Sequence, residues 1–293
     1  MSGRSSPPQT RGLLVDIDAG RRLHVVLAGP PGATPLVILE AGAFGFSADW
    51  ETVQACLAEA GFRSMAYDRA GLGFSDPASA PRDAAAIGAD LDRLLTALGE
   101  SGPYIYCGHS MAGLHARMFA ARRRGALTGV VLVDATTPEA VQSRSLAGLV
   151  RAFAVFCRAA AGGAALGLLR PLAVLGLGNA IGLEGAAAVE KRWAFADPGH
   201  NHFAALEVEA WLDSANQALV VGGFPRNLPV YAVLTGGRSL ARKVQADMDL
   251  AGDQGRMIRV EGASHASLLG PRHAKSIVKG VSLVQEAASR GPG

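Results

Sequence analysis

Cysteine, charge and aromatic side chains are all scarce in this sequence of 293 residues. The three cysteines, Cys56, Cys107 and Cys157, form no CxxC pair, so the sequence predicts neither a disulfide framework nor a zinc site and favours a reducing compartment. Only 18% of the residues are charged and the net charge is +3, which is unlike the basic footprint of a nucleic-acid-binding protein. We therefore expect no nucleic-acid partner and no metal.

Long uncharged hydrophobic runs are also missing. The most apolar region, 146–183, is interrupted by arginines, and its longest uncharged stretch has 13 residues, whereas a spanning helix needs roughly 20. The N-terminal segment is polar and bears prolines, so no signal peptide is expected and we place the protein in the cytoplasm. An apolar content of 49% and a mean hydropathy of +0.21 predict a chain that buries a sizeable core.

Short apolar runs alternate with helical patterns along most of the chain. The predicted strands are 13–18 and 23–27 (a hairpin), 35–40, 62–67, 104–108, 127–134, 229–234 and 257–260. The predicted helices are 47–60 (with Ser47 as N-cap), 83–98, 111–124, 239–250 and 274–288. Because the strands after the hairpin read as continuous apolar runs, the pattern predicts a mostly parallel sheet covered on both faces. We predict an open α/β fold of about eight strands.

One segment interrupts this alternation. Residues 136–227 contain no strand pattern, only Ala- and Leu-rich helical patterns with breaks expected at Gly162-Gly163, Pro171, Gly182 and Pro198-Gly199. An insertion of this length after one strand of a regular sheet is typical of a helical lid. We therefore predict a core formed by residues 1–135 and 228–293, and a helical lid formed by residues 136–227.

The sequence Gly108-His109-Ser110-Met111-Ala112-Gly113 lies between a predicted strand and a predicted helix. That is the context of a nucleophile elbow, in which a sharp turn exposes the serine oxygen. Ala112 stands where the second glycine of the G-x-S-x-G pattern usually stands. We interpret Ser110 as a nucleophile, the alternative being a serine that caps a helix.

With this motif the chain resembles the α/β-hydrolase superfamily over nearly its whole length. Residues 40–45 followed by Trp50 resemble the oxyanion loop, although the usual His-Gly is Ala41-Gly42 here; residues 67–76 resemble the D-R-x-G-x-G-x-S-D loop, and residues 262–265 the loop of the catalytic histidine. The resemblance implies an α/β-hydrolase fold with a helical lid inserted after strand six. A serine nucleophile argues against the dehalogenase and epoxide-hydrolase branches, which resemble this fold but use an aspartate.

The resemblance implies a triad of Ser110, Asp134 and His265, with His265 as general base. In most relatives the acid follows strand seven, but residues 235–239 here contain no carboxylate. Asp134 ends strand six, a position that certain haloalkane dehalogenases use similarly, and it keeps the order Ser-acid-His. The alternatives for the acid are Asp247, Asp249 and Asp253.

The same resemblance also implies an oxyanion hole. The backbone N–H groups of Met111 and Ala43 are expected to form the oxyanion hole. Phe44, His109, Trp193 and Trp211 are candidates for the substrate pocket, or else pack the lid on the core. His200 and His202 are interpreted as part of a polar lid loop and not as metal ligands. The lid arginines leave association with a lipid surface open.

We hypothesise a serine hydrolase that cleaves a small-molecule carboxylic ester with an apolar acyl or aryl group, without a cofactor. One alternative is that the same triad acts on an amide, a lactone or a C–C bond, or transfers an acyl group. A second alternative is a non-hydrolytic protein that binds a small molecule on a hydrolase scaffold. The sequence leaves the natural substrate and the oligomeric state open.

Overall fold

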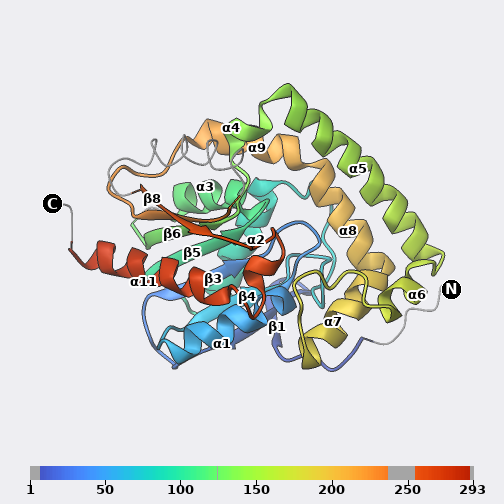
Figure 1. Ribbon diagram of the computed structural model, residues 1–293, viewed down its shortest axis with the longest axis horizontal. Coiled ribbons are helices and arrows are strands. Elements are labelled where there is room, and N and C mark those ends of the chain that lie inside the picture. The colour runs from blue at the N-terminus through green and yellow to red at the C-terminus, as the bar shows by residue number, and fades with distance from the viewer. Residues whose placement is uncertain (1–6, 124, 237–254, 291–293) are drawn as a thin grey trace.

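Strands from distant parts of the chain form one eight-stranded sheet in the computed structural model, which describes residues 7–123, 125–236 and 255–290 (Figure 1). The strands are β1 (Leu13–Asp18), β2 (Arg21–Ala28), β3 (Leu36–Glu40), β4 (Ser64–Tyr67), β5 (Tyr104–His109), β6 (Leu127–Val133), β7 (Val230–Thr235) and β8 (Gly255–Val260). Their order is β1-β2-β4-β3-β5-β6-β7-β8. Strand β2 is antiparallel to β1 and β4, and the other neighbours are parallel. The predicted open, mostly parallel sheet is confirmed.

Helices cover both faces of this sheet. Helices α1 (Glu51–Glu59) and α11 (Ala274–Arg290) pack on one face, and α2 (Ala84–Ala97) and α3 (Ala112–Arg122) pack on the other (Figure 1). Strand β3 shows why its sequence reads as an unbroken apolar run. Val37 and Leu39 are buried on the α1/α11 side, whereas Ile38 between them is buried on the α2/α3 side. Both faces of the strand therefore need apolar side chains.

The helix predicted to start at Ser47 begins differently. A 3₁₀ turn, η1 (Ser47–Trp50), precedes α1, and its N-cap is Phe46. The prediction of Ser47 as N-cap is wrong, because Ser47 is already inside the turn and its backbone N–H donates to Asp68 Oδ1 at 2.7 Å. The predicted helix 239–250 lies outside the described residues.

A set of helices stands between β6 and β7, in the segment predicted to be the lid. These inserted helices are α4 (Pro138–Val141), α5 (Arg144–Ala165), α6 (Leu169–Val174), α7 (Gly185–Ala196), α8 (Pro198–Glu209) and α9 (Trp211–Val221). Helices α5 and α8 run side by side along one edge of the molecule (Figure 1). Whether the insertion acts as a separate lid domain stays a prediction.

Two of the expected helix breaks are wrong. Gly162 and Gly163 lie inside the continuous helix α5, and Pro171 lies inside α6. A break does occur at Pro198, because α7 ends at Ala196 and α8 begins at Pro198. Asp197 is the N-cap of α8 and accepts a hydrogen bond from the backbone N–H of His200 at 2.8 Å. Proline is favoured at the first position of a helix because its missing N–H has no partner there. His200 and His202 are consequently helical, not part of a polar loop.

Helix α5 also contains a stretch that passes a test for length and hydropathy, although the search of the sequence for long uncharged runs did not find it. Among the residues that the structure describes, Leu146–Ala165 is long and apolar enough, by length and composition, to cross a membrane. Only 11% of that stretch is buried. Its two arginines, Arg151 and Arg158, divide it into shorter uncharged runs in the sequence.

Candidate functional site

Ser110 occupies a sharp turn between strand β5 and helix α3. Its φ of +56° is unusual for a residue with a side chain. Hydrogen bonds hold the turn on both sides: Ser110 N–H donates to Val133 O at 3.1 Å, and Thr136 N–H donates to Ser110 O at 2.8 Å. A strained backbone persists where its surroundings over-determine it, and such positions cluster at functional sites. The turn has the geometry expected of a nucleophile elbow.

Glycines beside Ser110 permit close backbone contacts. A Cβ atom on Gly113 would lie 2.6 Å from Thr136 O, and one on Gly108 would lie 3.0 Å from Ala112 O. The distance at Gly113 is too short for a Cβ atom, and the distance at Gly108 is tighter than most real Cβ contacts. The close approach therefore falls on Gly113, one residue after Ala112, and this explains why alanine is accommodated at position 112.

Asp134 and His265 are brought together from β6 and from the loop after β8. The ring nitrogen Nδ1 of His265 lies 2.7 Å from Asp134 Oδ2, and the Thr235 hydroxyl donates to the other carboxylate oxygen at 3.3 Å. Asp134 is buried and has a φ of +42°. Burial opposes ionisation of this carboxyl, but the hydrogen bond and charge of His265 outweigh it and lower its pKa. The end of β7 thus supplies a hydroxyl to an acid at the end of β6.

Ser110 and His265 belong to adjoining segments, since the ring of His109, the residue before Ser110, lies 4.5 Å from the ring of His265. Within the described residues, Ser110 makes no hydrogen bond to His265, whose side chain is 52% exposed. With Nδ1 bound to Asp134, the other ring nitrogen of His265, Nε2, remains for proton exchange. Catalytic hydrogen bonds are often long without substrate.

His109 supports the histidine loop. Its Nε2–H donates to the backbone carbonyl of His265 at 3.0 Å, and the two rings lie 4.5 Å apart. Burial, reinforced by the charge of His265, lowers the pKa of His109 to about 3, so the ring is neutral at physiological pH. Sequence reasoning proposed His109 for the substrate pocket, and the structure shows it holding the loop that carries His265.

Two backbone donors beside Ser110 lack partners. Neither the N–H of Met111 nor that of Ala43 donates a hydrogen bond to any residue that the structure describes. The loop carrying Ala43 lies against the elbow, since a Cβ on Gly42 would be 2.7 Å from Ser110 Cβ. Buried unpaired N–H groups are rare in proteins. These donors are available to an oxygen atom beside Ser110.

A buried arginine holds the same loop from behind. Arg69 donates to the carbonyl oxygens of Ala41 at 2.5 Å and Gly42 at 2.9 Å. Its guanidinium also binds both carboxylate oxygens of Glu207, on helix α8, at 2.9 and 2.7 Å. Both residues of this ion pair are almost fully buried. The inserted helices are thereby connected to the loop that carries Ala43.

A second connection reaches Phe44, which also has a positive φ of +58°. Lys191 of α7 donates to the Phe44 carbonyl at 3.3 Å and to Asp49 Oδ2 at 2.9 Å. His200 of α8 accepts a hydrogen bond from Gly73 N–H at 3.0 Å. Burial, with help from the charge of Lys191, lowers the pKa of His200 to about 3. Sequence reasoning missed Glu207 and Lys191 because no local signal relates residues more than a hundred positions from their partners.

Four of the residues assigned to the oxyanion hole and pocket meet in one apolar cluster. Met111 and Trp211 are buried there, with Ala43 and Phe44 packed against the cluster. The indole N–H of Trp211 has no hydrogen-bond partner among the described residues. Trp193 lies outside this cluster and stacks on Phe74, with the two ring centroids 4.9 Å apart. A pocket role for Trp193 remains a prediction.

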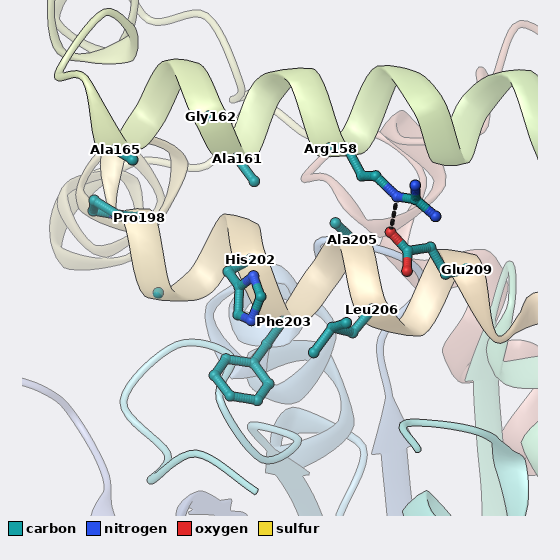
Figure 2. Close-up of a pocket in the computed structure, with 11 residues that line it drawn as sticks. Arg158, Ala161, Gly162, Ala165, Pro198, His202, Phe203, Ala205, Leu206 and Glu209 are labelled. Carbon is teal, nitrogen blue, oxygen red and sulfur yellow. Dashed lines mark hydrogen bonds and ion pairs between the residues drawn. The ribbon is translucent and has the colours of Figure 1, made fainter. Parts of the chain in front are cut away.

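The alternative acids Asp247, Asp249 and Asp253 lie outside the described residues. Within the described part of the chain, no group of three or more His, Cys, Asp or Glu residues could hold a metal. A cavity of about 720 Å³ lies away from Ser110, between α5 and α8 (Figure 2). It is lined by Arg158, Ala161, Gly162, Ala165, Pro198, Gly199, His202, Phe203, Ala205, Leu206 and Glu209.

Part of the chain matches known α/β-hydrolase sequences. Residues 35–154 match the family model described as the alpha/beta hydrolase fold. An "AB hydrolase superfamily protein" of Gibberella zeae is 34% identical over 152 residues, which is 46% of this chain and 47% of that protein. The "Probable transporter efuK" of Hormonema carpetanum is 37% identical over 131 residues, 42% of this chain and 18% of that protein. The match spans less than half the length of either relative.

Solved structures with the same fold include several kinds of hydrolase. The Cif epoxide hydrolase from Acinetobacter nosocomialis superposes with a TM-score of 0.72 at 17% identity, covering 92% of this chain and 87% of that one. A thermophilic esterase from Thermogutta terrifontis superposes with a TM-score of 0.67 at 18% identity, covering 94% of this chain and 99% of that one. An enol-lactonase from Burkholderia xenovorans superposes with a TM-score of 0.61 at 19% identity, covering 93% of this chain and 99% of that one. These likenesses confirm the predicted α/β-hydrolase fold.

Proposed function

We propose that this chain, a member of the α/β-hydrolase superfamily, is a serine hydrolase that cleaves carboxylic esters through an acyl-enzyme intermediate. The observation that carries the proposal is the buried Asp134 carboxylate bound to His265 at 2.7 Å, beside a serine in a strained turn. A serine hydroxyl is almost wholly protonated at neutral pH and needs such a base.

In the acylation step, Ser110 Oγ attacks the ester carbonyl carbon while His265 Nε2 takes the hydroxyl proton. Asp134 fixes the ring so that Nε2 is the free nitrogen, and its charge stabilises the imidazolium that forms. The C–O bond to the alcohol then breaks, and the alcohol leaves with the proton from His265. In deacylation a water molecule repeats the sequence on the acyl-enzyme, releasing the acid and restoring Ser110.

The oxyanion of the tetrahedral intermediate would be bound by the N–H groups of Met111 and Ala43. Both donors are backbone groups without partners in the described residues. A donor that is already oriented costs no reorganisation when charge develops, and removing one such donor typically costs about 10²–10³ in kcat. Arg69 would maintain the hole indirectly, because it binds the carbonyls of Ala41 and Gly42 and so fixes the orientation of the following N–H groups.

The substrate is proposed to present an apolar acyl or aryl group. The cluster beside the elbow consists mainly of apolar side chains, including Met111, Phe44 and Trp211. The unpartnered indole N–H of Trp211 offers one donor within this apolar environment. A site of apolar walls with few polar groups is typical of small-molecule binding.

The test is hydrolysis of a p-nitrophenyl ester series, from acetate to long acyl chains, together with an aryl lactone. We expect Ser110→Ala to lose turnover and Asp134→Asn to lower kcat by about 10³–10⁴-fold, because the amide no longer holds the imidazole in the correct tautomer. Folding of each variant is checked by circular dichroism.

Two outcomes would contradict the assignment. Full activity in Asp134→Asn would exclude Asp134 as the acid and direct attention to the aspartates at 247, 249 and 253. Tight binding of an apolar ligand without turnover of any ester would favour the non-hydrolytic alternative. A preference for the lactone over open-chain esters would keep the triad and narrow the substrate class.

A further inference from the structure

Helix α5 presents an apolar surface to solvent, and the surface continues into α6. The most exposed large apolar side chains of this region are Leu149 (65%), Val155 (67%), Phe156 (65%), Leu166 (78%), Leu168 (63%), Val174 (79%) and Leu175 (76%). We call these residues the outer apolar face. Proteins that are monomeric in water rarely expose apolar patches larger than a few hundred Å², and larger ones mark interaction sites.

The sides of α5 differ in a regular way. Val150, Cys157 and Ala164 recur every seven residues, or two turns, and are buried. Leu149 and Phe156 border the solvent face along one side. Arg144, Arg151 and Arg158, also seven apart, border it along the other. The helix therefore lies along the molecule with one buried side, an exposed outward face of small and apolar residues, one apolar border and one cationic border.

The charge of this region has one sign. Residues 144–183 contain four arginines, the fourth being Arg170, and no acidic residue. Arg158 forms an ion pair with Glu209 across the end of the cavity between α5 and α8, as Figure 2 shows. A helix with an apolar surface and arginines beside it matches the interface of a bilayer that carries anionic lipids, where the apolar groups enter the acyl boundary and the cations meet phosphates.

We propose that the outer apolar face binds the surface of an anionic phospholipid bilayer, with α5 lying in the interface plane. The buried side formed by Val150 and Cys157 keeps α5 packed on the rest of the protein, which favours a helix that lies on the membrane over one that spans it. A second copy of the chain fits less well. If two copies packed through α5 in an antiparallel, twofold-symmetric contact, the cationic border of one helix would lie against the cationic border of the other. The arginines of the two copies would then repel one another.

This proposal does not depend on the catalytic assignment, and its test does not use activity as the readout. The full chain is mixed with vesicles of phosphatidylcholine alone and of phosphatidylcholine with phosphatidylglycerol, and the bound fraction is measured by flotation. We expect binding to the anionic vesicles to be at least about tenfold tighter than to neutral ones and to weaken with salt.

Three variants separate the contributions. Phe156→Asp/Val174→Asp, which places charge on the apolar face, should lower partitioning by on the order of 10- to 100-fold. Arg144→Glu/Arg151→Glu should lower binding to anionic vesicles by at least about tenfold. Val220→Asp is the matched control, because Val220 is an 87% exposed apolar residue of α9 outside the face. It should bind as wild type does, and circular dichroism should show all variants folded.

Several results would overturn the proposal. The first is that the wild type binds neither vesicle type. The second is that Val220→Asp loses as much vesicle binding as Phe156→Asp/Val174→Asp, and the third is that Phe156→Asp/Val174→Asp binds vesicles as well as the wild type. Light scattering after size exclusion covers the second-copy alternative. A dimer that Phe156→Asp/Val174→Asp converts to monomer, without vesicle binding by the wild type, would assign the face to self-association.

Discussion

Helices α5 and α8 are neighbours, yet they place opposite kinds of side chain in opposite environments. Helix α8 carries Glu207 and His200 into the interior, where both are almost fully buried. Helix α5 leaves Phe156 and Val155 about two thirds exposed. Burial of polar groups and exposure of large apolar groups are the two departures from ordinary packing that most often have a functional reason.

The comparison separates two tasks within one insertion. The polar contacts of α8 lead toward the elbow: Glu207 binds Arg69, which binds the carbonyls of Ala41 and Gly42. The exposed apolar residues of α5, such as Val155 and Phe156, face solvent instead. One helix is expected to keep the oxyanion loop in place, and the other is expected to determine where the protein is located.

The largest expected effect is on the α8 side. Arg69→Met leaves the Glu207 carboxylate buried without its partner, which should cost about 3–5 kcal/mol of unfolding free energy. Urea unfolding measures this cost. Arg290→Met, at a 77% exposed ion pair, is the control and should change stability by less than about 1 kcal/mol.

The double variant Arg69→Met/Glu207→Leu sharpens the result. It removes the unpaired charge, so stability should largely return, whereas kcat for ester hydrolysis should stay low because the carbonyls of Ala41 and Gly42 still lack their donor. Recovery of both stability and kcat would show that Arg69 does not position the loop.

A second effect is the pH dependence of stability through His200. Its folded pKa of about 3 lies below the ordinary histidine value, so between these two pH values the unfolded chain binds a proton that the folded chain does not. Unfolding free energy should therefore decrease as pH falls below about 6.5, by roughly 1.4 kcal/mol per pH unit for this residue.

His200→Gln should remove this contribution, so that its unfolding free energy falls less steeply than that of the wild type between pH 7 and pH 5. His109, with a similarly lowered pKa, remains in both proteins and leaves a residual slope. His202→Gln, at an exposed position of the same helix, is the control and should follow the wild type. If the unfolding free energies of the wild type and His200→Gln changed equally with pH, the assignment of His200 as a buried, neutral histidine would be contradicted.

The smallest effect is expected on the outer side of α5. Phe156→Ala should change unfolding free energy by no more than about 0.5 kcal/mol, because the side chain is 65% exposed. Val150→Ala, on the buried side of the same helix, should cost about 1–2 kcal/mol. Equal costs at the two positions in thermal or urea unfolding would show that the apolar face is covered within the protein itself.

Local sequence patterns were sufficient for the sheet and the elbow. Continuous apolar strands, the loop motifs and the position of Ser110 are properties of neighbouring residues, and the structure has the predicted fold. The 2.7 Å contact between Asp134 and His265 agrees with the expected order of the triad, and the catalytic roles remain a proposal.

What the sequence could not provide depends on tertiary contacts. Glu207 meets Arg69 only after folding, across 138 positions, and no periodicity marks that pairing. His200 was assigned to a loop because Pro198-Gly199 resembles a break, although proline also begins helices. The exposure of α5 could not be inferred from the sequence, because the pattern of apolar residues in a helix is the same whether they contact protein, lipid or solvent.

The central claim is that Ser110 is a nucleophile activated by His265. The most direct measurement is intact mass after reaction with a fluorophosphonate, which phosphonylates an activated serine with release of fluoride. We expect a single adduct on the wild type, localised to Ser110 by peptide mapping, absent in Ser110→Ala and formed orders of magnitude more slowly in His265→Ala. An adduct that persists in Ser110→Ala, or a wild type that stays unmodified, would contradict the claim.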